Sequence, residues 1–214
     1  MLFSICELAS SLECVSARGM DWDGAYRSKQ TPWDKGAPSP GLVDFLEAAP
    51  MHGRVLVPGC GFGHDVRAIA ALPRVNVVGV DISPTALVRA RRFKKRGREK
   101  FLNVDLFHLP RELHGIFDWV WEHTCFCAIP LRRRKDYVSA VRSALKKGGE
   151  LVAIFFLDPG LTDPEAGPPF GVTKRQLNSL FLRSGAFELV HEWDPERAYP
   201  GREGRELMRV MRAL

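Results

Sequence analysis

Short apolar runs alternate with amphipathic segments along most of this chain. The apolar runs predict buried strands at residues 55–57, 75–80, 101–104, 117–121, 150–157, 186–193 and 205–214. Apolar positions at helical spacing predict helices at residues 40–49, 83–97, 132–147 and 173–184. A further helix is predicted from the end of the glycine-rich segment 59–63 to about residue 72. Strands that alternate with helices are typical of a doubly wound α/β sheet, and no linker or internal repeat divides it.

A glycine turn follows the first strand. Pro58 ends the apolar run, and Gly59, Gly61 and Gly63 stand at alternate positions before the next helix. At such a turn the backbone can approach a ligand closely, and amide N–H groups point outward. Asp81 ends the next strand, about 20 positions further on, where an acidic residue can bind ribose hydroxyls. The pattern predicts a nucleoside-containing cofactor at the carboxyl edge of the sheet.

The spacing of the glycines separates two kinds of cofactor. A dinucleotide fingerprint, G-x-G-x-x-G, would need glycine where this chain has His64, and the bulky Phe62 stands between two of the glycines. The G-x-G-x-G spacing therefore favours S-adenosylmethionine, which carries no phosphate. A turn without any ligand is the structural alternative.

Polar residues also follow the third and fourth strands. Asp105 comes at the same predicted edge as Asp81, where it can accept a hydrogen bond from an adenine amino group or cap a turn. Residues 122–124 (Glu-His-Thr) follow the fourth strand and are candidate site residues. The loop at 158–171 is long enough to be functional and presents Phe170 in a stiff Gly-Pro-Pro-Phe turn.

Large aromatic residues stand out in the polar segment 21–34. Trp22, Tyr26 and Trp33 each have a large apolar surface to bury. Two interpretations remain open from spacing alone. The segment is either a lid whose aromatic side chains close over the cofactor or an arm that packs on the domain.

Composition indicates a soluble globular protein. The chain has 214 residues, 45% hydrophobic and 26% charged, enough for one domain. No apolar run approaches the ~20 residues of a membrane span, and no signal peptide is recognisable, so we expect a cytoplasmic protein. The five cysteines have no framework spacing and indicate free thiols; Cys125-x-Cys127 lacks the second pair that a metal site needs. We expect residues 1–19 to form a flexible extension.

The net charge of +6 raises the question of nucleic acid. The densest basic run, residues 91–96 (Arg-Arg-Phe-Lys-Lys-Arg), ends a predicted helix, where cations complement the helix dipole. Its aromatic content does not suggest base stacking. We expect neither a nucleic-acid nor a membrane partner, and we expect a monomer.

Six motifs resemble one known family. They are Thr-Pro-Trp-Asp at 31–34, LVPGCGFGHDV at 56–66, VGVDIS at 78–83, EHTCFCAI at 122–129, LKKGGEL at 145–151 and GPPF at 167–170. In this order they resemble the thiopurine methyltransferase-like branch of class I S-adenosylmethionine-dependent methyltransferases, in particular thiol and halide methyltransferases. The resemblance covers residues 22–214.

The resemblance implies a fold, a cofactor and a set of site residues. The fold would be the Rossmann-like, seven-stranded class I sheet with its last strand antiparallel, in one domain from residue 20 to 214. A lid segment at about 20–40 would fold over S-adenosylmethionine. The cofactor-binding residues would be Trp22, Tyr26, Trp33, Gly59, Gly61, Asp81, Ile82, Asp105, Leu106 and Glu122.

The implied reaction is methyl transfer to a small soft nucleophile, a thiol or hydrosulfide. Halide and thiopurine are further candidates. The acceptor pocket would be lined by Trp33, His123, Phe126 and Phe170. His123 is the candidate to deprotonate or orient the acceptor, with a structural histidine as the alternative. Plant relatives often have Asp-Tyr in place of Glu122-His123 and tyrosine in place of Phe170, and tryptophan is frequent where this chain has Tyr26.

Two other functions remain as alternatives. Amine or RNA methyltransferases resemble one another in an Asn/Asp-Pro-Pro-aromatic motif after the fourth strand, where this chain has residues 122–125 (Glu-His-Thr-Cys). A protein that binds S-adenosylmethionine without catalysis would share the same cofactor residues. Turnover would distinguish it from an enzyme.

Overall fold

The computed structural model describes residues 20–163 and 166–214. The expectation of an extension at residues 1–19 lies outside this part of the chain. Seven strands form one sheet in the order β3-β2-β1-β4-β5-β7-β6. The strands are β1 (Gly53–Pro58), β2 (Val75–Asp81), β3 (Arg98–Asn103), β4 (Phe117–His123), β5 (Leu145–Phe156), β6 (Phe187–Trp193) and β7 (Glu206–Ala213).

The direction of the strands confirms the predicted sheet. Strands β1 to β5 pair in parallel, whereas β7 lies between β5 and β6 and runs antiparallel to both. The strand order reverses beside β1, which is the switch point at which ligands bind in open α/β sheets. The glycine turn follows β1, so the topology places it at this point.

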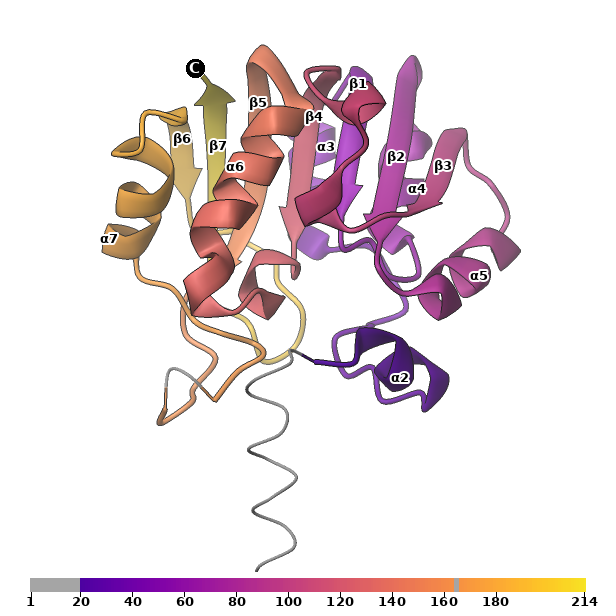
Figure 1. The fold of residues 1–214 in the computed structure, drawn as a ribbon, viewed down its shortest axis with the longest axis horizontal. Coiled ribbons are helices and arrows are strands. Elements are labelled where there is room, and N and C mark those ends of the chain that lie inside the picture. Colours follow the sequence, from indigo (N-terminus) through magenta and orange to yellow (C-terminus); the bar gives the residue numbers. More distant parts are fainter. Residues whose placement is uncertain (1–19, 164–165) are drawn as a thin grey trace, which may run out of the picture.

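Helices cover both faces of the sheet (Figure 1). They are α2 (Trp22–Arg27), α3 (Pro40–Ala48), α4 (His64–Ala70), α5 (Pro84–Arg92), α6 (Arg134–Ala144) and α7 (Lys174–Leu177). In Figure 1, α6 lies in front of the sheet and α3 and α4 lie behind it. Alternation along β1 divides the core, because Val55 and Val57 pack with the α3 and α4 side chains while Leu56 packs with those of α6.

Three helix boundaries differ from the prediction. The helix expected to run to residue 147 ends at Ala144, because Leu145 already pairs with Phe117 as the first residue of β5. The helix expected to reach residue 97 ends at Arg92; the chain then turns, and the Glu99 carboxylate accepts the Arg96 and Gly97 amides. The segment expected as one helix at 173–184 is α7 followed by a wider helical turn.

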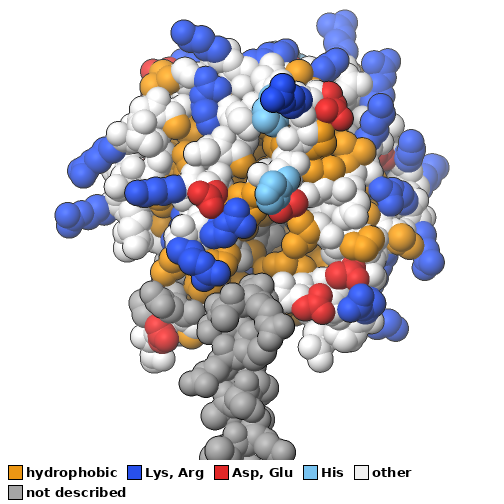
Figure 2. Space-filling view, viewed as in Figure 1, with side chains coloured by type: hydrophobic (Ala, Val, Ile, Leu, Met, Phe, Trp, Pro, Cys, Tyr) orange, Lys and Arg blue, Asp and Glu red, His pale blue; other side chains and the backbone are white. Residues whose placement is uncertain are grey.

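The carboxyl ends of the strands form one edge of the sheet, and α2 lies beside it (Figure 1). Figure 2 shows Lys and Arg side chains around the rim of the molecule and apolar side chains nearer the centre. Within the described ranges, no helix has the length and apolar character needed to span a bilayer.

Candidate functional site

The glycine turn packs against residues from two other elements. Gly59 and Gly61 have φ values of +55° and +51°, which side chains rarely adopt. A Cβ atom on Gly59 would lie 2.9 Å from the Cys125 Sγ, and one on Gly61 would lie 2.8 Å from the Tyr26 hydroxyl. Both conformation and space therefore require glycine at these two positions.

Asp81 ties the turn to the end of β2. Its carboxylate accepts the Gly61 and Ser83 amides, each at 2.8 Å. Burial raises the pKa of this carboxyl, and the backbone N–H groups oppose that shift. A carboxylate has about four acceptor positions, so further hydrogen bonds from hydroxyl groups can be accepted. Ile82 follows with half of its surface exposed, so the residues present fit a ribose and an adjoining flat base.

The aromatic segment at 21–34 begins with α2, which the sequence did not predict as a helix. Asp21 caps it by accepting the Gly24 amide at 2.8 Å. Asp23 then accepts the Ser83 hydroxyl at 2.7 Å and the Thr85 amide at 3.0 Å, both at the start of α5. These bonds hold α2 beside the carboxyl edge of the sheet.

The three aromatic residues of the lid segment lie together over the glycine turn. The Trp33 Nε1 donates to the Tyr26 hydroxyl at 3.1 Å, and the Trp22 and Trp33 ring centroids are 5.3 Å apart. Tyr26 also meets Phe62 of the turn edge to face, at 5.1 Å. The structure thus brings Trp22, Tyr26 and Trp33 into one cluster, as both the lid and the packed-arm interpretations require.

A small cavity lies between this aromatic segment, the glycine turn and the end of β4. Its volume is about 70 Å³, and its walls include Trp33, Gly59, Asp65, His123 and Tyr199. Tyr199 comes from the connection between β6 and β7; its hydroxyl donates to the Ala37 carbonyl at 2.6 Å, and its ring centroid is 5.5 Å from that of His123. Segments far apart in the chain therefore meet at this cavity.

His123 and Asp65 form a pair in the cavity wall, and their side chains are 6% and 14% exposed. Asp65, in the first turn of α4, accepts the Ser39 amide at 2.8 Å, the Trp121 Nε1 at 2.8 Å and the His123 Nδ1 at 3.2 Å. Burial alone would raise the pKa of Asp65, but the bonds from His123, Ser39 and Trp121 lower it overall. Asp65 is therefore an anion that accepts the Nδ1 proton of His123.

The other ring nitrogen of His123 is the chemically available atom. Nε2 is buried and has no hydrogen-bond partner among the described residues. Because Nδ1 donates to Asp65, a neutral ring carries its lone pair on Nε2. The arrangement can accept a proton at Nε2, and the Asp65 carboxylate stabilises the resulting imidazolium.

Comparisons with known proteins agree with this geometry. The profile of the family described as Thiopurine S-methyltransferase (TPMT) matches residues 17–210. The chain belongs to this family. S-adenosylmethionine is the cofactor that membership implies, as predicted from the glycine turn.

Two proteins of Arabidopsis thaliana are similar to this chain along most of its length. "Probable thiol methyltransferase 2" is 35% identical over 191 residues, which cover 86% of this chain and 81% of the relative. "Thiocyanate methyltransferase 1" is 34% identical over 206 residues, which cover 94% and 87%.

A solved structure shows the same fold. The 1,6-didemethyltoxoflavin-N1-methyltransferase of Burkholderia thailandensis, with S-adenosylhomocysteine bound, superposes with a TM-score of 0.70 at 20% identity. The match covers 100% of this chain and 92% of that one. The predicted class I methyltransferase fold is confirmed.

Glu122, which was predicted to bind the cofactor, does not line the small cavity beside His123. Its side chain is fully buried, accepts the Phe126 amide at 2.7 Å and accepts the Tyr137 hydroxyl. Burial raises its pKa to about 7, against the opposing hydrogen bonds. Alternation along β4 explains this position, because His123 packs on the Asp65 side and Glu122 points to the opposite face.

Two of the four predicted acceptor-pocket residues line the cavity. Trp33 and His123 do so. Phe126 is 2% exposed and packs in the core against the rings of Tyr137, Phe155 and Phe181. Phe170 is also buried, and its amide donates to the Cys127 carbonyl at 2.7 Å. Phe126 and Phe170 thus do not line this small cavity, and their place in an acceptor pocket stays a prediction.

Asp105 and Leu106 follow β3 beside Asp81. The Val104 amide donates to the Asp81 carbonyl at 3.2 Å, which brings Asp105 to the carboxyl edge. The Asp105 carboxylate accepts the Phe107 amide at 2.9 Å and contacts the His108 Nδ1 at 2.8 Å, so it caps the following turn. Leu106 is buried in the core. The capping alternative thus has direct contacts, and an adenine contact stays a prediction.

Sequence reasoning missed Asp65 and Tyr199. Asp65 had a detectable signal, since it directly follows the glycine turn in the first turn of a helix. Tyr199 lies in an irregular connection with no motif around it. The three cysteines among the described residues, Cys60, Cys125 and Cys127, are free thiols. No cluster of metal-ligating side chains occurs in the described ranges.

Proposed function

We propose that this protein is an S-adenosylmethionine-dependent methyltransferase whose acceptor is a small soft nucleophile, a thiol or hydrosulfide. The observation that carries this proposal is the buried, unpartnered Nε2 of His123 beside the glycine turn. Two relatives with thiol methyltransferase and thiocyanate methyltransferase in their names support the choice of acceptor class.

The residues at the carboxyl edge would hold the cofactor. Asp81 would accept the ribose hydroxyls, Ile82 would contact the adenine, and the backbone at Gly59 and Gly61 would lie along the methionine part. When bound, S-adenosylmethionine supplies a methyl group already activated by its sulfonium charge. Trp22, Tyr26 and Trp33 would cover it as a lid, which would exclude water from the acceptor.

His123 would act on the acceptor as a general base. The S–H proton of a thiol moves to Nε2, and the electron pair of that bond stays on sulfur as the nucleophilic lone pair. Asp65 keeps the Nδ1 proton in place and stabilises the imidazolium that forms. The lid and Tyr199 leave a cavity of only about 70 Å³ here, and this tight space favours a small acceptor.

Alignment of the acceptor with the methyl group would supply most of the rest of the rate enhancement. A sulfonium methyl group needs a nucleophile directly behind it, and holding two reactants in that geometry can contribute ~7–11 kcal/mol. A thiol with a pKa of ~8.5 already ionises in part near neutral pH, so the base improves the reaction rather than making it possible.

Purified protein with methyl-labelled S-adenosylmethionine tests the proposal. Hydrosulfide, a small aryl thiol, iodide, a thiopurine and bulk RNA are offered in parallel, and the labelled products are identified. We expect methylated products from the sulfur acceptors. Label in RNA would transfer the assignment to a nucleic-acid methyltransferase, and cofactor binding without any product would indicate a non-catalytic binding protein.

A further inference from the structure

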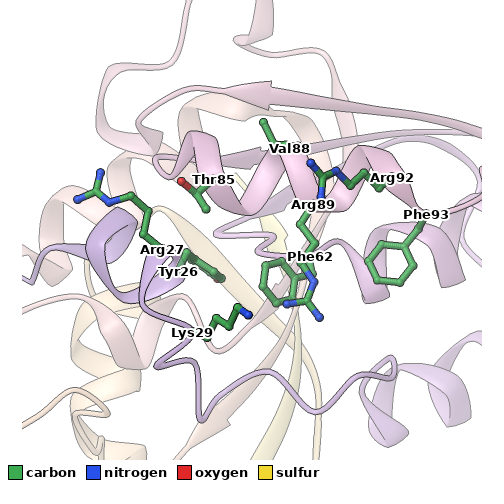
Figure 3. A pocket seen from close by; sticks show the side chains of 9 residues that line it. All are labelled: Tyr26, Arg27, Lys29, Phe62, Thr85, Val88, Arg89, Arg92 and Phe93. Atoms are coloured by element: carbon green, nitrogen blue, oxygen red, sulfur yellow. The ribbon is translucent and has the colours of Figure 1, made fainter.

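A second cavity lies beside the α2 region, and Asp81 is not among its lining residues. Its volume is about 640 Å³, and it opens between the α2 region and α5. Arg27 and Lys29 come from the lid segment, and Arg89 and Arg92 come from α5; Phe62 and Phe93 supply aromatic surface (Figure 3). The proposed methyl transfer uses none of the four cations.

The positive charges in this cavity are largely uncompensated. Lys29, Arg89 and Arg92 form no ion pair with any residue that the structure describes, and the lining residues include no acid. Arg27 is paired with Asp23 at 2.8 Å and with Asp21 at 3.7 Å. Cations from two elements therefore face one space, where an anion would relieve their mutual repulsion.

Aromatic rings lie next to these cations. The Arg89 guanidinium stacks on Phe62, 4.1 Å from the ring centroid, which fixes its plane while leaving N–H groups free along its edge. The Phe93 ring is 40% exposed, and the Arg67 guanidinium covers it at 4.3 Å. Figure 3 shows the Phe62 and Phe93 rings beside the Arg89 side chain. A flat aromatic group can stack in this cavity while an attached anion meets the cations.

We propose that this cavity binds a mononucleotide, with its phosphates on Arg89, Arg92 and Lys29 and its base against Phe93. The volume falls within the range of small-molecule sites, ~300–1,000 Å³, and suits a ligand of this size. Planar guanidinium groups recognise phosphate through paired N–H donors.

Binding of a nucleotide in this cavity would increase the affinity of the protein for the cofactor. Tyr26 and Phe62 line both this cavity and the smaller one beside His123, so the two sites share a wall. A phosphate that bridges the lid and α5 adds to the contacts of Asp23 with Ser83 and Thr85 and keeps the lid docked. The coupling is reciprocal, so bound cofactor raises nucleotide affinity by the same factor. This coupling rests on the proposed function, whereas nucleotide binding itself does not.

Isothermal titration of the full chain with ATP, AMP, adenosine and inorganic triphosphate tests the site. The variant R89A/R92A should weaken ATP binding by at least about tenfold, because it removes two charge-assisted contacts. The matched control is K94A/K95A, which loses the same charge from the exposed chain just beyond α5 and should bind ATP normally. Equal losses in both variants would overturn the proposal, as would no binding of any probe at millimolar concentration.

Two more variants test whether the nucleotide base contacts Phe93 and whether ATP binds outside the cofactor site. F93L should weaken AMP and ATP but leave inorganic triphosphate unchanged; an equal effect on all three would overturn the role of the ring. D81N should weaken S-adenosylhomocysteine and spare ATP, whereas loss of both would mean that ATP occupies the cofactor site. Saturating ATP should lower the dissociation constant of S-adenosylhomocysteine in the wild type but not in R89A/R92A. Tighter binding of a single-stranded oligonucleotide than of ATP would contradict a mononucleotide site.

Discussion

Replacing His123 with glutamine removes a basic nitrogen in the cavity wall that has no hydrogen-bond partner among the described residues. Nε2 is buried, has no partner among the described residues, and keeps its lone pair because Nδ1 donates to Asp65. Glutamine is also polar and of similar length. The substitution therefore tests proton transfer more than packing.

The expected loss of kcat/KM in H123Q follows from the fraction of the thiol acceptor that is ionised without a base. A thiol with a pKa of ~8.5 is about 3% thiolate at pH 7 and about 24% at pH 8. An enzyme without its base depends on that fraction, so H123Q should lose about thirty-fold in kcat/KM at pH 7 and about fourfold at pH 8. At pH 9.5, where such a thiol is about 90% thiolate, the loss should almost vanish.

The assay is kcat/KM for such a thiol from pH 6.5 to 9.5. His191, which is exposed on β6, provides the control variant H191Q, which should follow the wild type throughout. Where thiocyanate is turned over, H123Q should act on it normally, because that anion has no proton to lose. A loss in H123Q that stays constant across the pH range, or that is equal for thiol and thiocyanate, would refute the role of His123 as a base.

Three further substitutions test the carboxylates. Asp65→Asn leaves at least one buried donor unpaired, so urea unfolding at pH 7 should show a loss of ~1–3 kcal/mol. Because the folded pKa of Asp65 is lowered, that loss should shrink as the pH falls below ~4. The pKa of Glu122 is raised to about 7 in the folded protein. Its contribution to the free energy of unfolding is therefore fully present below pH ~4.3 and is lost as the pH rises through 7. The free energy of unfolding of E122Q should therefore rise relative to that of the wild type between pH 4 and 8, by about 4 kcal/mol at most; a pH-independent difference would contradict this. D81N should weaken S-adenosylhomocysteine about 10–100-fold by calorimetry, while D118N, at the opposite end of the sheet, should bind it normally.

Local chemistry made the centre of the site predictable. The strand, the glycines and Asp81 lie within one short stretch, and each residue's use follows from its own backbone or charge. The Asp81 carboxylate accepts the Gly61 amide, so these two predicted site positions lie together, and the binding of ribose by Asp81 stays a prediction. The parallel core of the sheet was equally predictable, because the apolar runs are separated by helices of the right length.

Contacts between distant segments were not predictable. Asp65 and His123 are 58 positions apart, and their bond depends on how β4 lies beside β1. The direction of Glu122 depends on strand alternation at the very end of β4, where one residue decides which face a side chain takes, and Phe126 lies in a short helical turn after the strand. α2 is a single short helix held by Asp21 and Asp23, and its polar sequence carries little hydrophobic pattern.

The most direct test of the central claim follows both products of one reaction. Purified protein receives S-adenosylmethionine and hydrosulfide, and methanethiol and S-adenosylhomocysteine are measured together. We expect the two to form in equal amounts, at a rate that depends on hydrosulfide concentration. Tight binding of S-adenosylhomocysteine by the same preparation, with no methanethiol and no thioether from any thiol, would contradict the proposed methyl transfer to sulfur.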